Sequence, residues 1–273
     1  MHNLSAEIIK PGNLTPFQIR YKVFVEENGF IKSNFIPMYF SKKMLEKDGY
    51  DDYAFHIVVY LNKKDNKKPI AAARVVLDSD YGLPINRHFI HNIDRKLNFI
   101  CEMSRISILK QYQKTKALEI IFSLAYIISR YILKVDFCLI NANPDTHSIY
   151  YANNLYNYLV GNSFLHPVIQ AEPLENNCNM VYNPDSFLLG EQDCFVVPNM
   201  IKKYINMNFR VIGFPIYIPK YNMCGMPMAL HLNEFNVRYD KHFKRITNCF
   251  DLPDKEFIVS DLISNGHALF IKT

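Results

Sequence analysis

At residues 101–108 the chain reads Cys101-Glu102-Met103-Ser104-Arg105-Ile106-Ser107-Ile108. Apolar and polar residues alternate, which is typical of a β-strand with one polar face. The period of two places Glu102, Ser104 and Ile106 on one face. It places Met103, Arg105 and Ser107 on the other. A carboxylate, a hydroxyl and a guanidinium within four residues are costly to bury unless they find partners.

Candidate partners for these polar groups lie upstream, at Arg20, Glu46, Asp48, Asp51 and Arg74. They would satisfy the strand if its polar face were buried. The alternative is a solvated edge strand whose charges contact water. The spacing leaves both interpretations open.

The bulk composition indicates a globular protein, with 49% hydrophobic and 21% charged residues among 273. The formal net charge of +5 suits an acidic partner, a nucleic acid or no partner. No block of Lys and Arg interleaved with aromatic residues indicates nucleic-acid binding. We therefore expect no nucleic-acid partner.

Cysteine and histidine spacing argues against a metal centre. The six cysteines form no C-x-x-C pair, which favours a reducing compartment and a cytoplasmic protein, and the nine histidines form no ligand pair. Residues 1–7 lack the basic and apolar regions of a secretory signal. The apolar run 117–133 contains Glu119 and Arg130, so it predicts a buried helix rather than a transmembrane segment.

The remaining pattern predicts an α/β (α+β) fold. Strands are expected at 6–10, 54–61, 69–77, 101–108, 135–142, 209–218 and 226–235, and helices at 17–28 (Thr15 as N-cap), 110–134, 146–159 and 200–206. Tyr150 and Tyr158 are expected in the core, and the tail 256–273 has strand-like ends. We predict one domain over 1–273, with 171–195 an insertion or long loop and 236–273 a C-terminal extension of unknown role.

A set of short motifs then appears in order: Arg20-x-x-x-Phe24, Phe30, Glu46-x-Asp48-x-x-Asp51, Arg74 and Glu102-x-Ser104-Arg105. This set resembles the signature of the autoinducer (acyl-homoserine-lactone) synthases, which the N-acyl amino acid synthases and exosortase-associated acyltransferases share. All are variants of the GNAT acyltransferase fold, so the resemblance implies a three-layer fold with a mixed, mostly antiparallel sheet. It covers 17–135 well and is absent from 171–195 and 236–273.

Two departures decide between branches of this group. The length of the chain, and Phe30 where the lactone synthases carry Trp, favour the N-acyl amino acid synthases. The stretch Gln111–Ala117 replaces the glycine-containing pyrophosphate loop of CoA-using GNAT enzymes and contains no glycine. Backbone amides there cannot easily wrap a pyrophosphate, which favours an acyl carrier protein over CoA.

The resemblance implies attack of an amine on an acyl thioester, with Glu102 as general base and with Arg20, Asp48 and Asp51 shaping the amine site. Burial among the aspartates would raise the pKa of Glu102, and the arginines oppose this. The alternatives are that Glu102 is only a salt-bridge partner and that the aspartates only form an acidic turn.

Substrate binding is assigned by the same resemblance to Arg74, Ser104, Arg105, Glu46, Phe24 and Phe30. Ser104 and Arg105 would face the pantetheine and its phosphate, and backbone amides beside a bulge in this strand would hold the thioester. Met103, Phe122, Ile140 and residues 209–218 could line an acyl tunnel or form ordinary core.

We therefore predict an N-acyltransferase that moves a fatty acyl group from an acyl carrier protein thioester to the amine of an amino acid or related small amine. The acyl-phosphopantetheine thioester is a co-substrate, with acyl-CoA less favoured, and no bound cofactor or metal is expected. No transmembrane segment is expected, and the product would partition into membranes. The alternatives are a lactone synthase using S-adenosylmethionine and a non-catalytic GNAT-fold protein that binds lipid or carrier protein.

Overall fold

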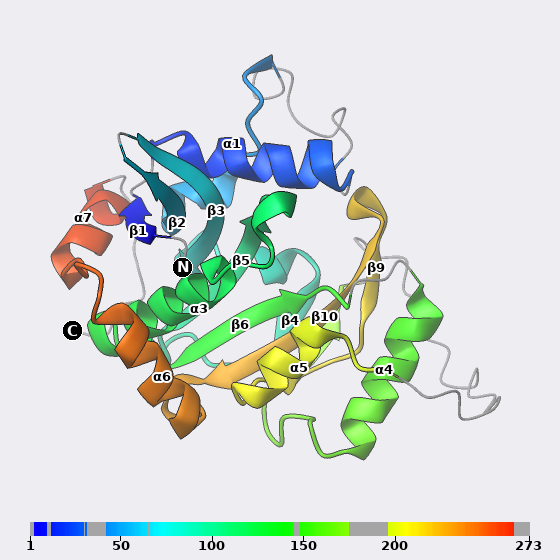
Figure 1. The fold of residues 1–273 in the computed structure, drawn as a ribbon. Coiled ribbons are helices and arrows are strands. Elements are labelled where there is room, and N and C mark those ends of the chain that lie inside the picture. Colours follow the sequence, from blue (N-terminus) through cyan, green and yellow to red (C-terminus); the bar gives the residue numbers. More distant parts are fainter. Residues whose placement is uncertain are drawn as a thin grey trace.

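The computed structural model describes residues 3–9, 12–29, 31, 42–64, 66–144, 148–174 and 196–264. An eight-stranded sheet runs through the molecule in the order β1-β2-β3-β5-β6-β10-β8, with β9 also paired to β10 (Figure 1). The strands are β1 Leu4–Ile9, β2 Ala54–Lys63, β3 Asn66–Leu77, β5 Ile100–Ile108, β6 Phe137–Ala142, β8 Arg210–Val211, β9 Ile216–Ile218 and β10 Met223–His231. A separate ribbon pairs β4 (Phe89–His91) with β7 (Ala171–Pro173).

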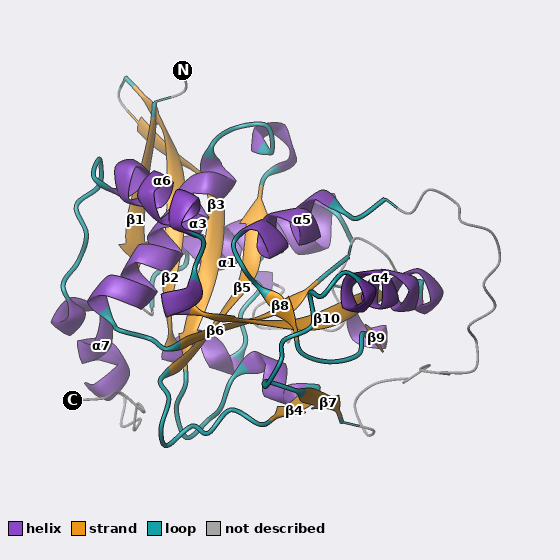
Figure 2. Ribbon diagram, turned by 90° about the horizontal axis from the view of Figure 1, so that it is seen from below, coloured by secondary structure: helices purple, strands orange, loops and turns teal. Residues whose placement is uncertain are grey.

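Helices cover both faces of this sheet (Figure 2). One face packs against α3 (Ala117–Ile127, continued by a π-helical turn Ile128–Ile132), α4 (Ile149–Gly161), α5 (Asn199–Asn206), α6 (Val237–Thr247) and α7 (Lys255–Ser264). The other face carries α1 (Thr15–Tyr21, continued by Lys22–Glu27) and the short 3₁₀ turns η3 (Gly49–Tyr53) and η4 (Pro84–Arg87). The predicted mixed, mostly antiparallel sheet between helical layers is confirmed.

The predicted buried helix is present as α3, whose residues from Ile120 to Ile127 are all buried. It begins at Ala117 rather than Lys110, because residues 110–116 form a 3₁₀ turn (η5, Lys110–Tyr112) and a bend. Among the described residues no helix is long and apolar enough to cross a membrane. Thr15, the predicted N-cap, is instead the first residue of α1, and Leu14 is the N-cap.

Two other expectations were wrong. The tail was expected to have strand-like ends, but residues 255–264 form α7, and 265–273 lie outside the described residues. Tyr150 and Tyr158 are exposed, because α4 buries a stripe made of Ala152, Leu155 and Leu159. At about 100° per residue, Tyr150 points away from this stripe. The expected insertion or long loop 171–195 begins with strand β7. Residues 175–195 lie outside the described residues.

A β-bulge interrupts β5 where it pairs with β3. Ala72 pairs with Ser107 and Arg74 with Ser104, so two residues, Arg105 and Ile106, lie opposite Ala73 alone. Arg105 has a left-handed backbone, with φ of 55°, as the first residue of some bulges does.

The bulge overturns the simple alternation expected for residues 101–108. Ile106 and Ile108 join Cys101 and Met103 in the core on the α3 face. Arg105 lies with Ser104 on the opposite face, where Ser104 accepts from Arg74 and Arg105 lies 3.5 Å from Asp48. An extra residue in a strand inverts the phase of every side chain after it, which explains the error.

β5 and β6 form the parallel pair of the sheet. Their register covers Ile100 with Phe137, Cys101 with Cys138 and Glu102 with Leu139, and it ends there. Both strands continue beyond this point, and Figure 1 shows them running apart. The sheet therefore splits directly after Glu102.

Candidate active site

The site begins with Arg20, which α1 places beneath the sheet with its side chain fully buried. Its Nε donates to Glu46 Oε2 at 2.5 Å, and its Nη1 and Nη2 donate to the two carboxylate oxygens of Asp51 at 2.5 and 3.2 Å. This bidentate geometry gives the planar guanidinium the carboxylate partners that its burial requires.

The acidic turn before β2 holds its own carboxylates in place. Asp48 caps the η3 turn by accepting from the Tyr50 backbone N–H at 3.0 Å, and Asp51 Oδ2 accepts from the Asp48 N–H at 2.8 Å. This reciprocal capping box fixes both backbones. The remaining carboxylate oxygens point toward the arginines, so the turn is more than a strand cap.

β3 and β5 bring the other cations. Arg74 is buried, and its Nη1 donates to Asp48 Oδ1 at 2.6 Å and to Asp51 Oδ1 at 3.0 Å, while its Nε donates to Ser104 Oγ at 3.2 Å. Arg105 is partly exposed, with Nη2 3.5 Å from Asp48 Oδ2 and Nε 3.3 Å from Glu46 Oε1. These charged side chains therefore extend from the buried Arg20 to Arg105, which is in contact with solvent.

Three guanidinium groups and three carboxylates share this cluster, which we call the ionic cluster: Arg20, Arg74, Arg105, Glu46, Asp48 and Asp51. Burial would raise the pKa of Asp48, but Arg74 and Arg105 outweigh it and lower the pKa to about 2. The pKa of Asp51 is likewise held far below its usual range by Arg20 and Arg74, against the effect of burial. Both aspartates are ionised at neutral pH.

Glu102 lies on the same face but behaves in the opposite way. Its side chain is buried, and burial raises its pKa to about 7, against the Ile85 N–H, Arg74 and Arg105, which lower it. Oε2 accepts a hydrogen bond of 2.6 Å from the Ile85 backbone N–H, the one hydrogen bond that the Glu102 side chain makes within the described residues. A carboxyl group with a pKa near 7 can accept a proton at physiological pH.

Three contributors were missed by the sequence analysis. Ile85 acts through its backbone N–H, which no side-chain pattern reveals. Tyr50 lies close enough to Glu102 for that carboxylate to raise its pKa, in addition to burial, and Arg87 lies 4.4 Å from the Tyr50 ring centroid. Tyr221 accepts from Arg105 Nη2 at 3.1 Å across a sequence separation of 116 residues.

His56 is buried beside the ionic cluster and stays neutral. Burial lowers its pKa to about 3, although Asp51, whose Oδ1 lies 3.8 Å from Nε2, favours the charged form. Its side chain packs edge-on against Phe17 at 5.2 Å. Phe24 packs with Val23 and Ile19 in an apolar cluster, and Phe30 lies outside the described residues, so their substrate-binding roles stay predictions.

An apolar pocket of about 30 Å³ lies on the opposite face of the sheet. Met103 and Phe122, two of the expected tunnel residues, line it, as does Phe209 from the interrupted strand, whereas Ile140 does not. The other lining residues are Val75, Ala125, Tyr126, Ser129, Cys138, Met207, Leu230, Leu232, Phe235 and Phe243. This space is smaller than a small-molecule site, so an acyl chain would enter it only if the lining side chains moved apart.

Glu102 and Met103 are consecutive residues at the split between β5 and β6, and they point to opposite faces. The carboxylate faces the ionic cluster and the thioether faces the apolar pocket. The split therefore has a proton acceptor on one side and an apolar cavity on the other. Within the residues that the structure describes, no group of His, Cys, Asp or Glu could hold a metal ion.

These features are those of an acyltransferase with a GNAT-like fold, and a family comparison gives the particular group. The family model described as N-acyl amino acid synthase FeeM matches residues 16–173, more than half of the chain. The chain belongs to this family and is an acyltransferase, which confirms the resemblance seen in the sequence. None of the curated proteins matches the chain.

Three solved structures are similar to this chain. FeeM, an N-acyl amino acid synthase from uncultured soil microbes, is 12% identical over 86% of this chain and 93% of its own, with a TM-score of 0.44. BjaI, a CoA-dependent acyl-homoserine lactone synthase, is 11% identical over 97% and 99%, with a TM-score of 0.49. The loading GNATL domain of CurA from Lyngbya majuscula is 9% identical over 84% and 98%, with a TM-score of 0.47.

Proposed function

We propose that this acyltransferase moves a fatty acyl group from an acyl carrier protein thioester to the amine of an amino acid or a related small amine. The observation that carries the proposal is Glu102, a buried carboxyl with a pKa of about 7 at the split between β5 and β6. An ordinary surface glutamate would be a far weaker base.

The reaction balances with the groups at this site. The amine nitrogen attacks the thioester carbonyl carbon, forming the C–N bond, and the C–S bond breaks as the tetrahedral intermediate collapses. Glu102 takes the proton that the amine loses, directly or through water, and the pantetheine sulfur leaves and is protonated to the thiol. The ionic cluster would position the amine, because its carboxylate oxygens can accept hydrogen bonds from the amine N–H groups.

The thioester would lie along β5 beyond Glu102. From Met103 onward the edge of β5 that faces β6 is not paired with it, so backbone N–H and C=O groups are available to an extended ligand. Backbone N–H groups beside the bulge can stabilise the developing oxyanion. Arg105, partly exposed at the rim of the ionic cluster, supplies a cation for the pantetheine phosphate.

The fatty acyl chain would occupy the apolar pocket on the α3 face, since Met103 in its wall directly follows Glu102. A carrier protein is favoured as donor because the segment before α3, residues 111–117, has no glycine with which to cradle a pyrophosphate. The proposal assigns no resident cofactor, because Glu102 and the β5 backbone can supply the acid–base and oxyanion chemistry. It places the enzyme in the cytoplasm, with a product that partitions into membranes.

The test mixes purified protein with acyl carrier proteins bearing C8 to C18 chains, a pool of amino acids and S-adenosylmethionine, and identifies products by mass spectrometry. We expect an N-acyl amino acid. Glu102→Gln should abolish its formation, while Glu7→Gln on the exposed strand β1 should not. A lactone product would overturn the acceptor assignment, and equal use of acyl-CoA at low concentration would overturn the donor assignment.

A further inference from the structure

We propose that α6 and the lysines preceding α3 form the docking surface for the acyl carrier protein. This inference rests on the proposed donor and names the part of the molecule that recognises it. α6 lies beyond residues 16–173, which the family model matches. The surface, here called the basic face, consists of Lys110, Lys114, Lys116, Arg238, Lys241, Lys244 and Arg245.

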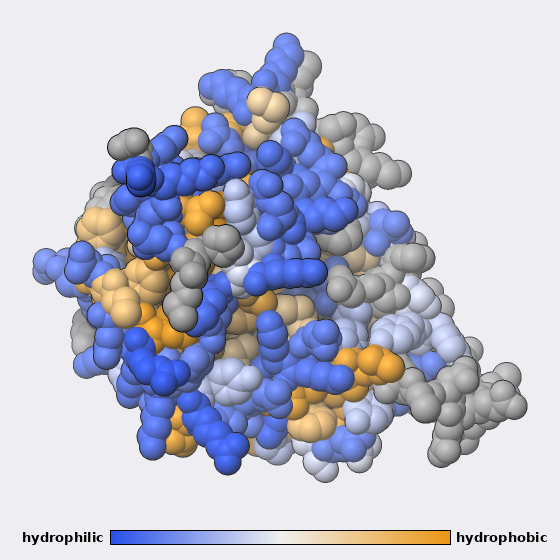
Figure 3. All heavy atoms as spheres, viewed as in Figure 1, coloured by the Kyte–Doolittle hydropathy of each residue, from blue (hydrophilic) through white to orange (hydrophobic). Residues whose placement is uncertain are grey.

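α6 carries a local excess of positive charge. Residues 237–247 contain four basic residues and one acid, a net of +3 within a chain whose total is +5. All four basic side chains are exposed. The acid, Asp240, accepts from Tyr126 and Tyr131 and pairs with Lys244, so it is held against the protein. Figure 3 shows strongly hydrophilic side chains gathered over this helix.

The segment between β5 and α3 adds further cations. Lys110, Lys114 and Lys116 are exposed, and no acidic residue occurs between Glu102 and Glu119. Lys116 immediately precedes α3, whose N-terminus also carries the positive end of the helix dipole. In the sequence these lysines come directly after β5, the strand along which the thioester would lie.

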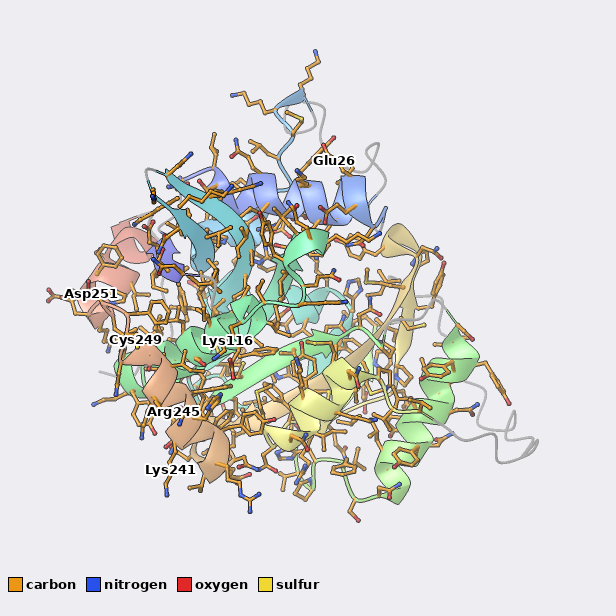
Figure 4. The ribbon with its side chains drawn as sticks, viewed as in Figure 1. Glu26, Lys116, Lys241, Arg245, Cys249 and Asp251 are labelled. Atoms are coloured by element: carbon orange, nitrogen blue, oxygen red, sulfur yellow. The ribbon has the colours of Figure 1, made fainter. Side chains whose placement is uncertain are left out.

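Contacts between α3 and α6 bring the two groups of cations together. Asp240 meets Tyr126 and Tyr131 near the end of α3, whereas His242 contacts Glu119 in its first turn, with Nε2 2.5 Å from Oε1. α6 therefore crosses α3, with Asp240 and Lys244 facing the end of α3 and His242 facing its first turn. Arg245, which reaches His242 Nδ1 at 3.0 Å, follows toward the α3 N-terminus. Figure 4 shows Lys241, Arg245 and Cys249 in succession along α6, with Lys116 to the right of that helix.

The inner side of α6 contacts the proposed acyl site. Phe243 is buried in the α6 interface with α3, and it lines the apolar pocket together with Phe235 and Tyr126. One helix thus presents cations to solvent and an apolar wall to the pocket. A partner that docks on the outer side delivers its acyl group near the pocket. A carrier protein with an acidic helix fits this charge pattern.

The test measures binding and turnover separately. A Lys241→Glu/Arg245→Glu variant is compared with Lys63→Glu/Lys64→Glu, which reverses two exposed charges in the turn between β2 and β3, drawn well apart from α6 in Figure 1. Binding of acyl carrier protein is followed by fluorescence anisotropy without acceptor. Turnover is followed with the acyl carrier protein and with an acyl-N-acetylcysteamine thioester, a small donor that needs no docking.

We expect the α6 variant to bind the carrier protein at least about ten-fold more weakly at low salt, with the difference shrinking as salt rises. Its turnover of the small donor should stay within about two-fold of the unmodified protein. A wild-type protein that binds the carrier through α6 but forms no product would refute the proposed function and leave the docking surface supported.

Three results would overturn the docking surface. The first is equal loss in the β2–β3 control, which would indicate bulk charge. The second is equal loss with both donors, which would mean that α6 only supports the pocket. The third is unchanged carrier binding, and if binding to vesicles containing anionic lipid is lost at the same time, the basic face serves a membrane surface instead.

Discussion

Replacing Glu102 by glutamine should abolish acyl transfer and yet stabilise the fold at alkaline pH. The native carboxyl has a pKa of about 7 against 4.5 for an ordinary glutamate, because its burial disfavours the charged form. Each pKa unit corresponds to about 1.4 kcal/mol, so the ionised group destabilises the folded state by about 3 kcal/mol above pH 7. Glutamine keeps an acceptor for the Ile85 N–H but brings a donor that needs a partner, which reduces the gain to between about 1 and 3 kcal/mol.

The pH dependence has a defined sign. Since the folded pKa is raised, the carboxyl contributes its full stability below pH 4.5, and this is lost as the pH rises through about 7. The difference in unfolding free energy between Glu102→Gln and the unmodified protein should therefore grow over this window and then level off. Urea unfolding at a series of pH values measures it.

Activity should follow the same ionisation. The kcat/KM of the unmodified protein should fall at acid pH with an apparent pKa near 7, because the base must be unprotonated. Glu46→Gln is the contrasting variant, because Glu46 is paired with Arg20 and Arg105. Its replacement should lower the free energy of unfolding at all pH values near 7. If Glu102→Gln lowers stability at pH 8 and retains full transfer, the carboxylate is only an ion-pair partner and the reasoning fails.

Four further outcomes are expected from the site and the pocket. Asp51→Asn should lower the unfolding free energy by about 3–5 kcal/mol in urea titrations, because it leaves Arg20 and Arg74 buried with one carboxylate fewer. The unmodified protein should also lose stability in acid titrations as the pH falls below 3.8, since the pKa of Asp51 is lowered by folding. Ala125→Phe adds a ring to the pocket wall and should shift products toward shorter acyl chains in a mixed-donor assay read by mass spectrometry. Arg105→Lys keeps the charge but loses the planar fork, so the KM for the thioester should rise about ten-fold with little change in melting temperature.

Much of the site could be predicted from local sequence. The polar groups of residues 101–108 need partners if buried. Ser104 and Arg105 found them in the upstream Arg74, Glu46 and Asp48. Glu102 instead accepts from the Ile85 N–H. The apolar run 117–133 predicted a buried helix because nearly every side chain in it is apolar, whichever way the helix turns. Apolar runs likewise predicted strands at 54–61 and 69–77, and alternation predicted β5; these three strands pair as neighbours in the sequence commonly do.

The tertiary structure decided what depends on distant parts of the chain. The bulge at Arg105 arises from the pairing of β5 with β3, and it moved that guanidinium to the face of Ser104. The pKa of Glu102 is set by burial beneath η4 and the ionic cluster, elements that no pattern around residue 102 contains. α7 formed where strand ends were expected, because packing of Ile258 on the core outweighed a weak local preference. Sequence determined which groups would need partners, and only the fold fixed their distances and their burial, on which the chemistry depends.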